Sequence, residues 1–195
     1  MTVTRRQFVF TAACVLGLAA AAPQFVPQIA FASSGAEAYV NQVGNSVIQA
    51  ANSGSVDQFR SLLRQNADIP SIALFSLGQY RSNLPEGSRA EYYRLVERSI
   101  SSVFAAHTSK LAGKTLTVSG SRGAPDSVIV ASRLEEPGGR AVPVLWRVVQ
   151  RGGGFKIFDV NVDGVWLANT QKTSFTSVLQ RNGGSVEALM EHLRR

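Results

Sequence analysis

Two aspartates in the stretch FDVNVDG, residues 158–164, are the best candidates in this sequence for acid–base chemistry. Asp159 and Asp163 are four residues apart, so both side chains would lie on the same face of an extended strand. Carboxylates that are buried together shift each other's pKa, and one of them can then act as a general base. The alternative is a polar sheet face that ends in a turn at Asp163-Gly164. A catalytic Asp159 would have to point into a pocket, whereas strand alternation places it opposite Val160.

The other reactive residue types form no catalytic pattern. Neither His107 nor His192 has a second histidine at metal-binding spacing, and the sequence has no G-x-S-x-G motif for a serine nucleophile. The glycines of RGGG, residues 151–154, lie between two predicted strands, which is the wrong context for a phosphate-binding loop. Cys14 is the only cysteine and lies near the N-terminus, so we expect no disulfide, no metal site and no cofactor. The sequence therefore favours binding over catalysis.

The elements that position these residues change their hydrophobic period near the middle of the chain. Apolar residues at helical spacing predict four helices, at residues 33–54, 55–66, 70–81 and 88–113. From Lys114 the period becomes two, which predicts four strands joined by short turns, the last strand spanning residues 155–167. Two closing helices are predicted at residues 169–182 and 185–195. This order predicts an α+β fold, with a curved four-stranded antiparallel sheet packed against a layer of helices.

The last predicted strand changes its pattern at Phe158. Phe155 and Ile157 are apolar on either side of Lys156, whereas Phe158 and Val160 begin the opposite phase. Both faces of the sheet would be covered where this strand starts, or a β-bulge at Ile157-Phe158 would shift the phase. The pattern alone leaves both explanations open.

Residues 1–32 are typical of a cleaved export signal. Arg5-Arg6 precede an apolar run, and Ala30-Phe31-Ala32 forms an A-x-A cleavage motif before Ser33. The paired arginines are similar to those of a twin-arginine signal, and an ordinary secretory signal is the alternative. The apolar run spans about 15 residues, which is too short to cross a bilayer. We therefore expect cleavage near Ala32-Ser33 and a single domain formed by residues 33–195.

The charge of the chain suits a surface that meets anionic groups. The net charge is +7, and removal of Arg5 and Arg6 with the signal leaves about +5. The cationic residues are scattered rather than gathered in blocks, so we expect no nucleic-acid partner.

Four motifs of this chain occur together, in the same order, in one known family. FKIFDVNVDGVWL, residues 155–167, is similar to W-K-V-Y-D-V-x-V-E-G-V/I-S-L, and IPSIALFSLGQYR, residues 69–81, is similar to I-A-x-x-x-L-G-x-Y-W/R. VPVLWRVV, residues 142–149, is similar to a V-P-V-x-Y-R-L strand, and residues 173–193 are similar to the closing helices. Over residues 36–193 the chain thus resembles the MlaC family, the periplasmic phospholipid-binding components of the Mla lipid-transport system, also called the toluene-tolerance auxiliary family.

The resemblance implies a periplasmic lipid carrier that is not an enzyme. Such a protein would hold phospholipid acyl chains in an apolar pocket between sheet and helices, because each CH₂ exposed to water costs about 0.8 kcal/mol. It would shuttle the lipid, as a monomer, between an outer-membrane lipoprotein complex and an inner-membrane ABC transporter complex. The expected pocket-lining residues are Phe75, Leu77, Tyr80, Val103, Phe104, Val144, Trp146, Val148, Phe158 and Val160. The expected headgroup-rim residues are Arg81, Arg147 and Lys172.

Two departures from the family pattern leave the cargo open. Trp166 stands where the family has a small residue, and Gln171 stands where an aromatic residue is common. An indole beside the pocket would narrow it, so the alternative cargo is a hopanoid or another polycyclic lipid, as in the hopanoid-associated branch of the family. From other classes, the alternatives are an NTF2-like enzyme with Asp159 as its base and a structural envelope protein with a filled core.

Overall fold

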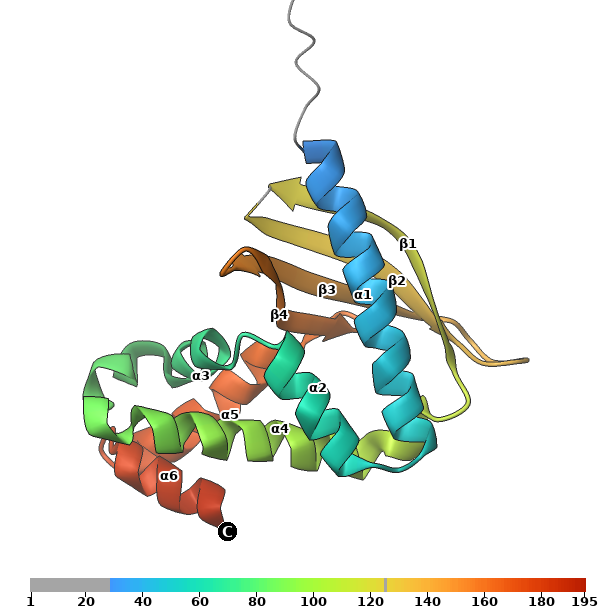
Figure 1. Cartoon of the computed structure of the whole chain (residues 1–195). Helices are drawn as coiled ribbons and strands as arrows, with labels where there is room; N and C mark the ends of the chain where they lie inside the picture. Colours follow the sequence, from blue (N-terminus) through green and yellow to red (C-terminus); the bar gives the residue numbers. More distant parts are fainter. Residues whose placement is uncertain (1–28, 125) are drawn as a thin grey trace, which may run out of the picture.

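The computed structural model describes residues 29–124 and 126–195 (Figure 1). Four helices precede the sheet and two follow it, as the change of hydrophobic period predicts, so the α+β fold class is confirmed. The first part consists of α1 (Ile29–Asn52), α2 (Val56–Asn66), α3 (Ile69–Leu77), the 3₁₀ turns η1 (Gly78–Asn83) and η2 (Glu86–Ser88), and α4 (Arg89–Leu111). The second part consists of β1 (Thr115–Ala124), β2 (Ser127–Glu135), β3 (Val142–Arg151), β4 (Gly154–Val162), β5 (Val165–Trp166), α5 (Leu167–Arg181) and α6 (Val186–Arg194).

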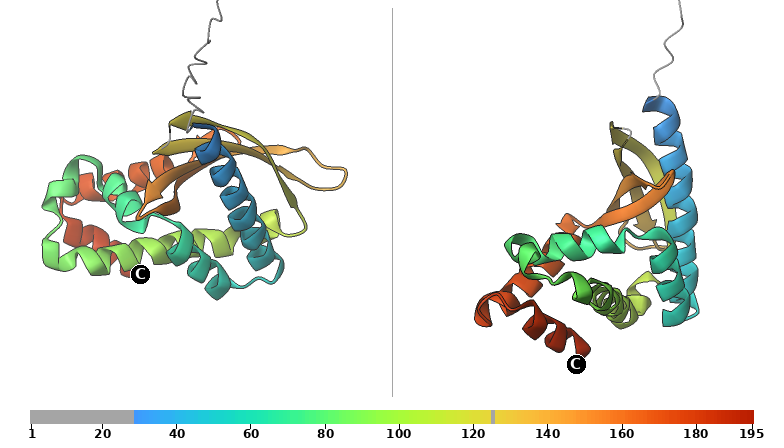
Figure 2. Two further views of the ribbon diagram at one scale, coloured as in Figure 1. Left: turned by 45° about the horizontal axis from the view of Figure 1, so that its top comes forward. Right: turned by 60° about the vertical axis from the view of Figure 1, so that its left-hand side comes forward.

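The sheet is antiparallel throughout, with the strands in the order β1-β2-β3-β4-β5. It curves, and α1 lies against one of its faces, while the other helices gather on the β4 side (Figures 1 and 2). Short connections between consecutive strands explain this order, because each strand can pair directly with the one before it.

The prediction of a single strand over residues 155–167 is wrong, because the chain turns sharply at Asp163-Gly164. Asp163 has φ 49° and Gly164 has φ 91°, and two successive residues with positive φ form a tight hairpin turn. Val162 pairs with Val165 across this turn, which creates the short fifth strand β5. The sheet therefore has five strands instead of four.

Replacing Gly164 with alanine should destabilise the protein by about 1 kcal/mol or more, because a Cβ is disfavoured at positive φ. Gly87→Ala is the matched control, since Gly87 is exposed, lacks a positive φ and has open space where a Cβ would lie. Urea unfolding of both variants measures the difference. Equal midpoints for the two variants would contradict the assigned turn.

A β-bulge explains the change of phase in β4. Arg147 pairs with Asp159 and Val148 pairs with Ile157, so Phe158 is the extra residue between two successive pairs. Of the two explanations that the sequence left open, the bulge is confirmed. Because paired residues share a face, Asp159 lies on the face of Arg147 and Ile157 lies on the opposite face.

The two faces of the sheet differ in what covers them. We call the α1 side the inner face, where buried residues of the strands pack against α1: Leu116, Val128, Val130, Leu134, Val144, Trp146, Val148 and Ile157. We call the opposite side the outer face, which carries Arg147, Asp159 and Asn161. Phe158 also lies on the outer face, since its ring contacts Arg147 and Phe75. The expectation that Phe158 and Val160 share one face is therefore wrong.

The helices have apolar clusters of their own. The larger cluster joins α3 to α6 and includes Leu77, Tyr92, Leu179 and Leu189, each fully buried. A small cluster, which we call the helix–helix seam, lies where α1, α2 and α4 meet, and its buried members are Ala50, Ala51 and Phe104. Val47 and Leu111 pack against both the seam and the inner-face cluster. The inner-face cluster and the seam therefore meet at Val47 and Leu111, and the cluster of α3 to α6 is separate from both.

The predicted export signal lies almost wholly outside the described residues. Residues 29–32 form the start of α1, and cleavage near Ala32-Ser33 stays a prediction. Among the helices that the structure describes, none has the length and apolarity required to cross a bilayer.

Candidate functional site

The inner face of β3 and β4 forms the centre of the candidate site. Val144, Trp146 and Val148 alternate along β3, and Val160 lies opposite Trp146 on β4. The indole N–H of Trp146 donates a hydrogen bond to Ser132 Oγ at 2.8 Å, and that hydroxyl donates to the backbone oxygen of Val144 at 3.2 Å. The polar atom of the indole is thus satisfied within the sheet, and the rest of the ring offers only apolar surface to the interior.

Helix α1 approaches the inner face closely at a buried glycine. A Cβ added to Gly44 would lie 2.3 Å from Cδ2 of Leu116 and 3.5 Å from Cζ2 of Trp146. Nearer the N-terminal end of α1, the hydroxyl of Tyr39 donates to the backbone oxygen of Asn66 at 3.0 Å. Burial raises the pKa of Tyr39 to about 12, so its hydroxyl stays neutral and adds no charge to the apolar interior.

Helix α2 is the most loosely packed helix around the interior. It carries the apolar residues Phe59, Leu62 and Leu63 on one side, yet none of its residues is buried. The ring of Phe59 stacks on that of Phe104, with centroids 3.8 Å apart. An amphipathic helix normally buries its apolar side completely. The apolar side of α2 can therefore take up further apolar contacts if the interior widens.

The residues after α2 fasten that helix to the sheet. Asp68 forms an ion pair with Arg151 at 2.8 Å, and its backbone N–H donates to the backbone oxygen of Ile157 at 2.9 Å. The ammonium of Lys156 donates to the backbone oxygen of Gln65. These contacts fix the C-terminal end of α2 to β3 and β4.

The predicted lining residues fall into separate groups. Val144, Trp146, Val148 and Val160 come together on the inner face, as expected. Phe104 lies in the helix–helix seam, which is linked to the inner-face cluster through Val47 and Leu111. The site therefore includes only half of the expected set.

The other predicted lining residues lie away from the inner face. Leu77 and Tyr80 belong to the cluster of α3 to α6. The ring of Phe75 contacts that of Phe158 on the outer face, with the ring centres 5.7 Å apart. Val103 is 58% exposed, so its expected place on the inner side of α4 is wrong.

The displacement of Val103 has a physical reason. The buried stripe in the second half of α4 follows Glu97, Ser101 and Phe104 instead of the apolar residues alone. Glu97 is buried because it pairs with Arg64 of α2 at 2.8 Å, and the Ser101 hydroxyl donates to the backbone oxygen of Glu97. Two polar residues thus take the buried stripe, and Val103 lies beside it on the exposed side.

The predicted rim residues do not surround the inner face. Arg81 is exposed in η1. The guanidinium carbon of Arg147 lies 4.6 Å from the ring centre of Trp166 and 5.9 Å from that of Phe158. The ammonium of Lys172 lies 5.1 Å from the ring centre of Phe75. Because the rings of Phe75 and Phe158 touch, Arg147 and Lys172 belong to one row of cations and aromatic rings on the outer side of the sheet.

Asp159 is buried on the outer face, where it caps a helix. Its Oδ1 accepts hydrogen bonds from the backbone N–H of Ala168, at the start of α5, and of Val160, at 2.9 and 2.8 Å. Burial raises the pKa of Asp159, while these hydrogen bonds and the charge of Arg147 oppose that rise. The N-cap residue of α5, Trp166, has no side-chain capping bond, so Asp159 takes over this role from the neighbouring strand.

The carboxylate pair that the sequence suggested does not form. Asp163 is exposed and forms an ion pair with Arg140 at 2.9 Å. It is therefore not buried together with Asp159. Asn161 is buried too, and its Oδ1 accepts from the backbone N–H of Gly164 at 3.0 Å. Within the described residues, no cluster of histidine, cysteine, aspartate and glutamate side chains is placed to bind a metal ion.

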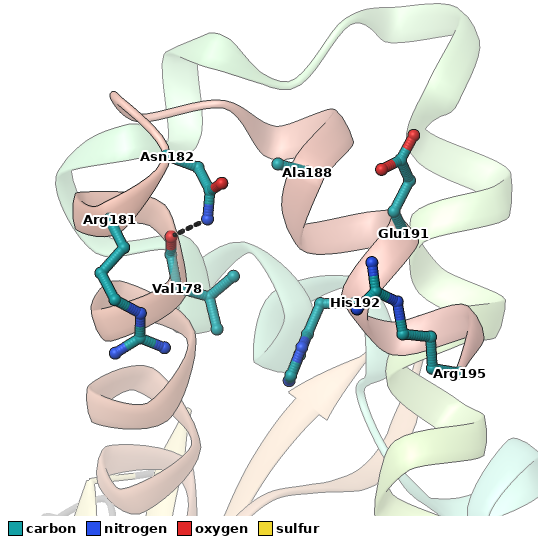
Figure 3. A pocket seen from close by; sticks show the side chains of 7 residues that line it. All are labelled: Val178, Arg181, Asn182, Ala188, Glu191, His192 and Arg195. Atoms are coloured by element: carbon teal, nitrogen blue, oxygen red, sulfur yellow. Dashed lines mark hydrogen bonds between the residues drawn. The ribbon is translucent and has the colours of Figure 1, made fainter.

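Two surface hollows lie away from the inner face. One, of about 240 Å³, opens between α5 and α6 beside Arg181, His192 and Arg195 (Figure 3). The other, of about 430 Å³, follows α5 past Lys172 and is otherwise lined by hydroxyl and amide side chains: Asn169, Thr173, Thr176, Ser177 and Gln180. Their polar linings do not suit an acyl chain, and the expected apolar pocket between sheet and helices stays a prediction.

Several residues of the site carried little signal in the sequence. Gly44 is the contact point of α1, and only its position inside a helical pattern could have singled it out. Val128 and Val130 line the inner face from β2. Alternation along β2 puts them on one face of the strand, but it does not show that this is the face of Trp146.

A curved antiparallel sheet with a buried apolar inner face, covered by amphipathic helices, is an arrangement that suits the binding of an apolar ligand. The sequence profile of the MlaC protein family matches residues 39–195, and the chain belongs to this family. The resemblance inferred from the four motifs is thereby confirmed.

A solved structure has the same fold. It is a phospholipid-binding protein from Ralstonia solanacearum in complex with a phospholipid, superposing with a TM-score of 0.69 at 22% sequence identity. The similarity covers 84% of this chain and 94% of that one. No curated protein sequence matches the chain.

Proposed function

We propose that this protein is a phospholipid carrier that holds the acyl chains against the inner face of its sheet. The observation that carries this proposal is the buried apolar row of Val144, Trp146 and Val148, which packs against α1 and borders the separate apolar cluster of the helix–helix seam. Acyl chains can enter such an interior by parting apolar surfaces, because the polar contacts of α2 with Glu97, Tyr39 and Lys156 all lie at the C-terminal end of that helix. The phospholipid in the solved relative supports the same cargo.

Helix α2 is the element that can move aside. Its apolar side is only half-buried, so displacing it exposes less apolar surface than displacing α1 would. Its C-terminal end stays fastened through Asp68 and Arg151. Residues Phe59, Leu62 and Leu63 would then contact the acyl chains.

The carrier works in the periplasm in this proposal. The export signal predicted for residues 1–32 and membership of the MlaC family support that location. The protein would shuttle a lipid between two membrane complexes, an outer-membrane lipoprotein complex and an inner-membrane ABC transporter complex. It would act as a monomer and catalyse no reaction, because the lipid only has to be shielded from water while it crosses the aqueous gap.

A phospholipid is favoured over a hopanoid as the cargo. The sequence suggested a polycyclic lipid because Trp166 would narrow the pocket. Trp166 pairs with Asn161 and lies over Arg147 on the outer face, whereas Trp146 and Val160 lie on the inner face. Its indole is thus separated from the proposed acyl-chain site by the sheet itself.

Native mass spectrometry of the protein purified from periplasm, without detergent, tests the proposal. We expect one bound phospholipid per chain, identified after organic extraction. A polycyclic triterpenoid would transfer the protein to the hopanoid carriers. A protein without lipid that also takes none from added vesicles would refute the carrier function.

A further inference from the structure

The helix–helix seam connects the half-buried side of α2 with the inner face of the sheet. Phe59 and Leu62 of α2 pack against the seam, where α1, α2 and α4 meet (Figure 1). Val47 and Leu111 pack against the seam as well, and they also pack against the inner-face cluster. Because every one of these side chains is apolar, a continuous apolar path leads from α2 through the seam to the inner face.

Polar contacts fasten the C-terminal end of α2 to three other elements. Arg64 forms an ion pair with Glu97 of α4 at 2.8 Å. Tyr39 of α1 and Lys156 of β4 donate hydrogen bonds to backbone oxygens in the last turn of α2. Separation of Arg64 from Glu97 would leave a buried carboxylate without its counter-charge, which costs more than parting two apolar side chains does. This end of α2 is therefore the fixed end.

The N-terminal half of α2, residues 56–60, lacks such fastening. Within the described residues, its side-chain hydrogen bonds and ion pairs reach only each other and the turn before the helix, at Ser53 and Ser55. That turn, residues 53–55, is exposed or half-buried, so its backbone can change direction without opening a buried contact. Apolar contacts such as that of Phe59 hold this half of α2 against α4.

The rings of Phe59 and Phe104 form a pair that separates easily. They are nearly parallel, at 2°, and their centres are 3.8 Å apart, so their faces lie over each other. Aromatic rings prefer offset or edge-to-face contacts, because two ring faces repel each other electrostatically. The ring pair of Phe75 and Phe158, at 78°, has such a preferred arrangement. Phe104 is 7% exposed and Phe59 is half-buried, which makes Phe59 the ring that can move.

We propose that acyl chains enter and leave through the helix–helix seam, and that Phe59 closes this entrance by stacking on Phe104. To admit a chain, the N-terminal half of α2 tilts outward about the fixed C-terminal end and carries Phe59 away from α4. The acyl chain then covers the face of Phe104, so this buried ring is not left in water. This inference rests on the proposed carrier function and adds the route by which the cargo is exchanged.

Two other borders of the inner face are closed more firmly than the seam. Ala36 and Val40 of α1 are fully buried in the inner-face cluster, so lifting α1 would expose side chains that are now completely shielded. At the β4 edge, Asp68 forms an ion pair with Arg151, and its backbone N–H donates to the oxygen of Ile157. An entrance at either border would therefore cost more free energy than one at the seam.

Reversible cross-linking of the protein purified from periplasm tests the entrance. In F59C/F104C, a thiol-specific cross-linker with a reducible spacer joins α2 to α4 across the seam, and residues 33–195 contain no other cysteine. Q65C/K156C is the matched control, because the same reagent joins the fixed end of α2 to β4. The measured quantity is the rate at which the protein takes a fluorescent phosphatidylglycerol from vesicles of phosphatidylglycerol and phosphatidylethanolamine. Cross-linking should slow uptake by roughly tenfold or more in F59C/F104C, reversibly on reduction, and by less than about twofold in Q65C/K156C.

Removal of the Phe59 ring tests the same entrance without a cross-linker, and it decides the question if F59C/F104C does not fold. Phe59→Ala should speed up uptake and release by about two- to tenfold, because the closed state loses one aromatic pair. Phe75→Ala is the control, since it removes a ring pair on the outer face. Equal rates in Phe59→Ala and the wild type, or an equal acceleration in Phe75→Ala, would overturn the proposed entrance.

The amount of lipid bound at equilibrium separates this inference from the carrier function. If the wild type holds lipid but cross-linked F59C/F104C exchanges it as fast as the reduced variant does, only the entrance is refuted. If the wild type neither holds nor takes up lipid, the carrier function fails and the entrance fails with it.

Discussion

Replacing Trp146 with alanine should lower the free energy of unfolding by about 3–5 kcal/mol, the range typical of a buried aromatic residue. The indole is only 7% exposed and packs between α1 and the strands of the inner face. Its loss leaves a cavity next to Gly44 and removes the hydrogen bond to Ser132. The same change removes the largest apolar group of the proposed lipid site, so the amount of bound lipid should fall as well. Urea unfolding and lipid extraction of one preparation measure both effects.

The second tryptophan of the chain is the matched control. Trp166 is half-buried on the outer face, and Trp166→Ala removes only its stacking on Arg147, worth about 1 kcal/mol at a partly exposed position. Trp166→Ala should also leave the amount of bound lipid unchanged. Comparable losses of stability or of lipid in the two variants would contradict the assignment of the inner face.

Replacing Asp159 with alanine should destabilise the protein by about 1–3 kcal/mol, because the buried N–H of Ala168 loses its acceptor and α5 loses its cap. Asp159→Asn is the informative partner variant, since the amide oxygen can still accept from Ala168. At neutral pH we expect Asp159→Asn to stay close to the wild type. If Asp159→Ala kept full stability, the capping role would be wrong.

The pH dependence follows from the raised pKa of Asp159. Because the folded state binds this proton more tightly than the unfolded state, the contribution of Asp159 to stability falls as pH rises. The fall begins near the ordinary pKa of an aspartate and ends above the raised pKa of the folded state. Asp159→Asn cannot titrate, so this part of the pH profile should be flat in that variant. A profile in Asp159→Asn that keeps the full slope would contradict the burial of the carboxylate.

The sequence predicted the fold well where its periodicity was long. The change from a period of 3.6 to a period of two at Lys114 located the start of the sheet, and β1 begins at Thr115. The bulge at Phe158 was one of two explanations, because the pattern of a single strand does not show how that strand is paired with its neighbour.

The candidate site was harder to predict than the fold. Val144, Trp146 and Val148 were found because alternation along one strand fixes a common face. Phe75 and Leu77 are neighbours on a helix that is apolar on nearly all sides, and such a pattern does not say which side meets the sheet. The burial of Asp159 could not be predicted either, since its partner Ala168 belongs to a different element.

Photo-crosslinking with a phospholipid tests most directly whether acyl chains bind at the inner face. A diazirine placed near the middle of an acyl chain marks the residues around it, and mass spectrometry of the digested protein identifies them. We predict labels on the inner-face residues of β3 and β4, including Val144, Trp146 and Val160, and on the apolar side of α2. Labels confined to the outer face, or to the surface of α5, would contradict the proposed carrier site.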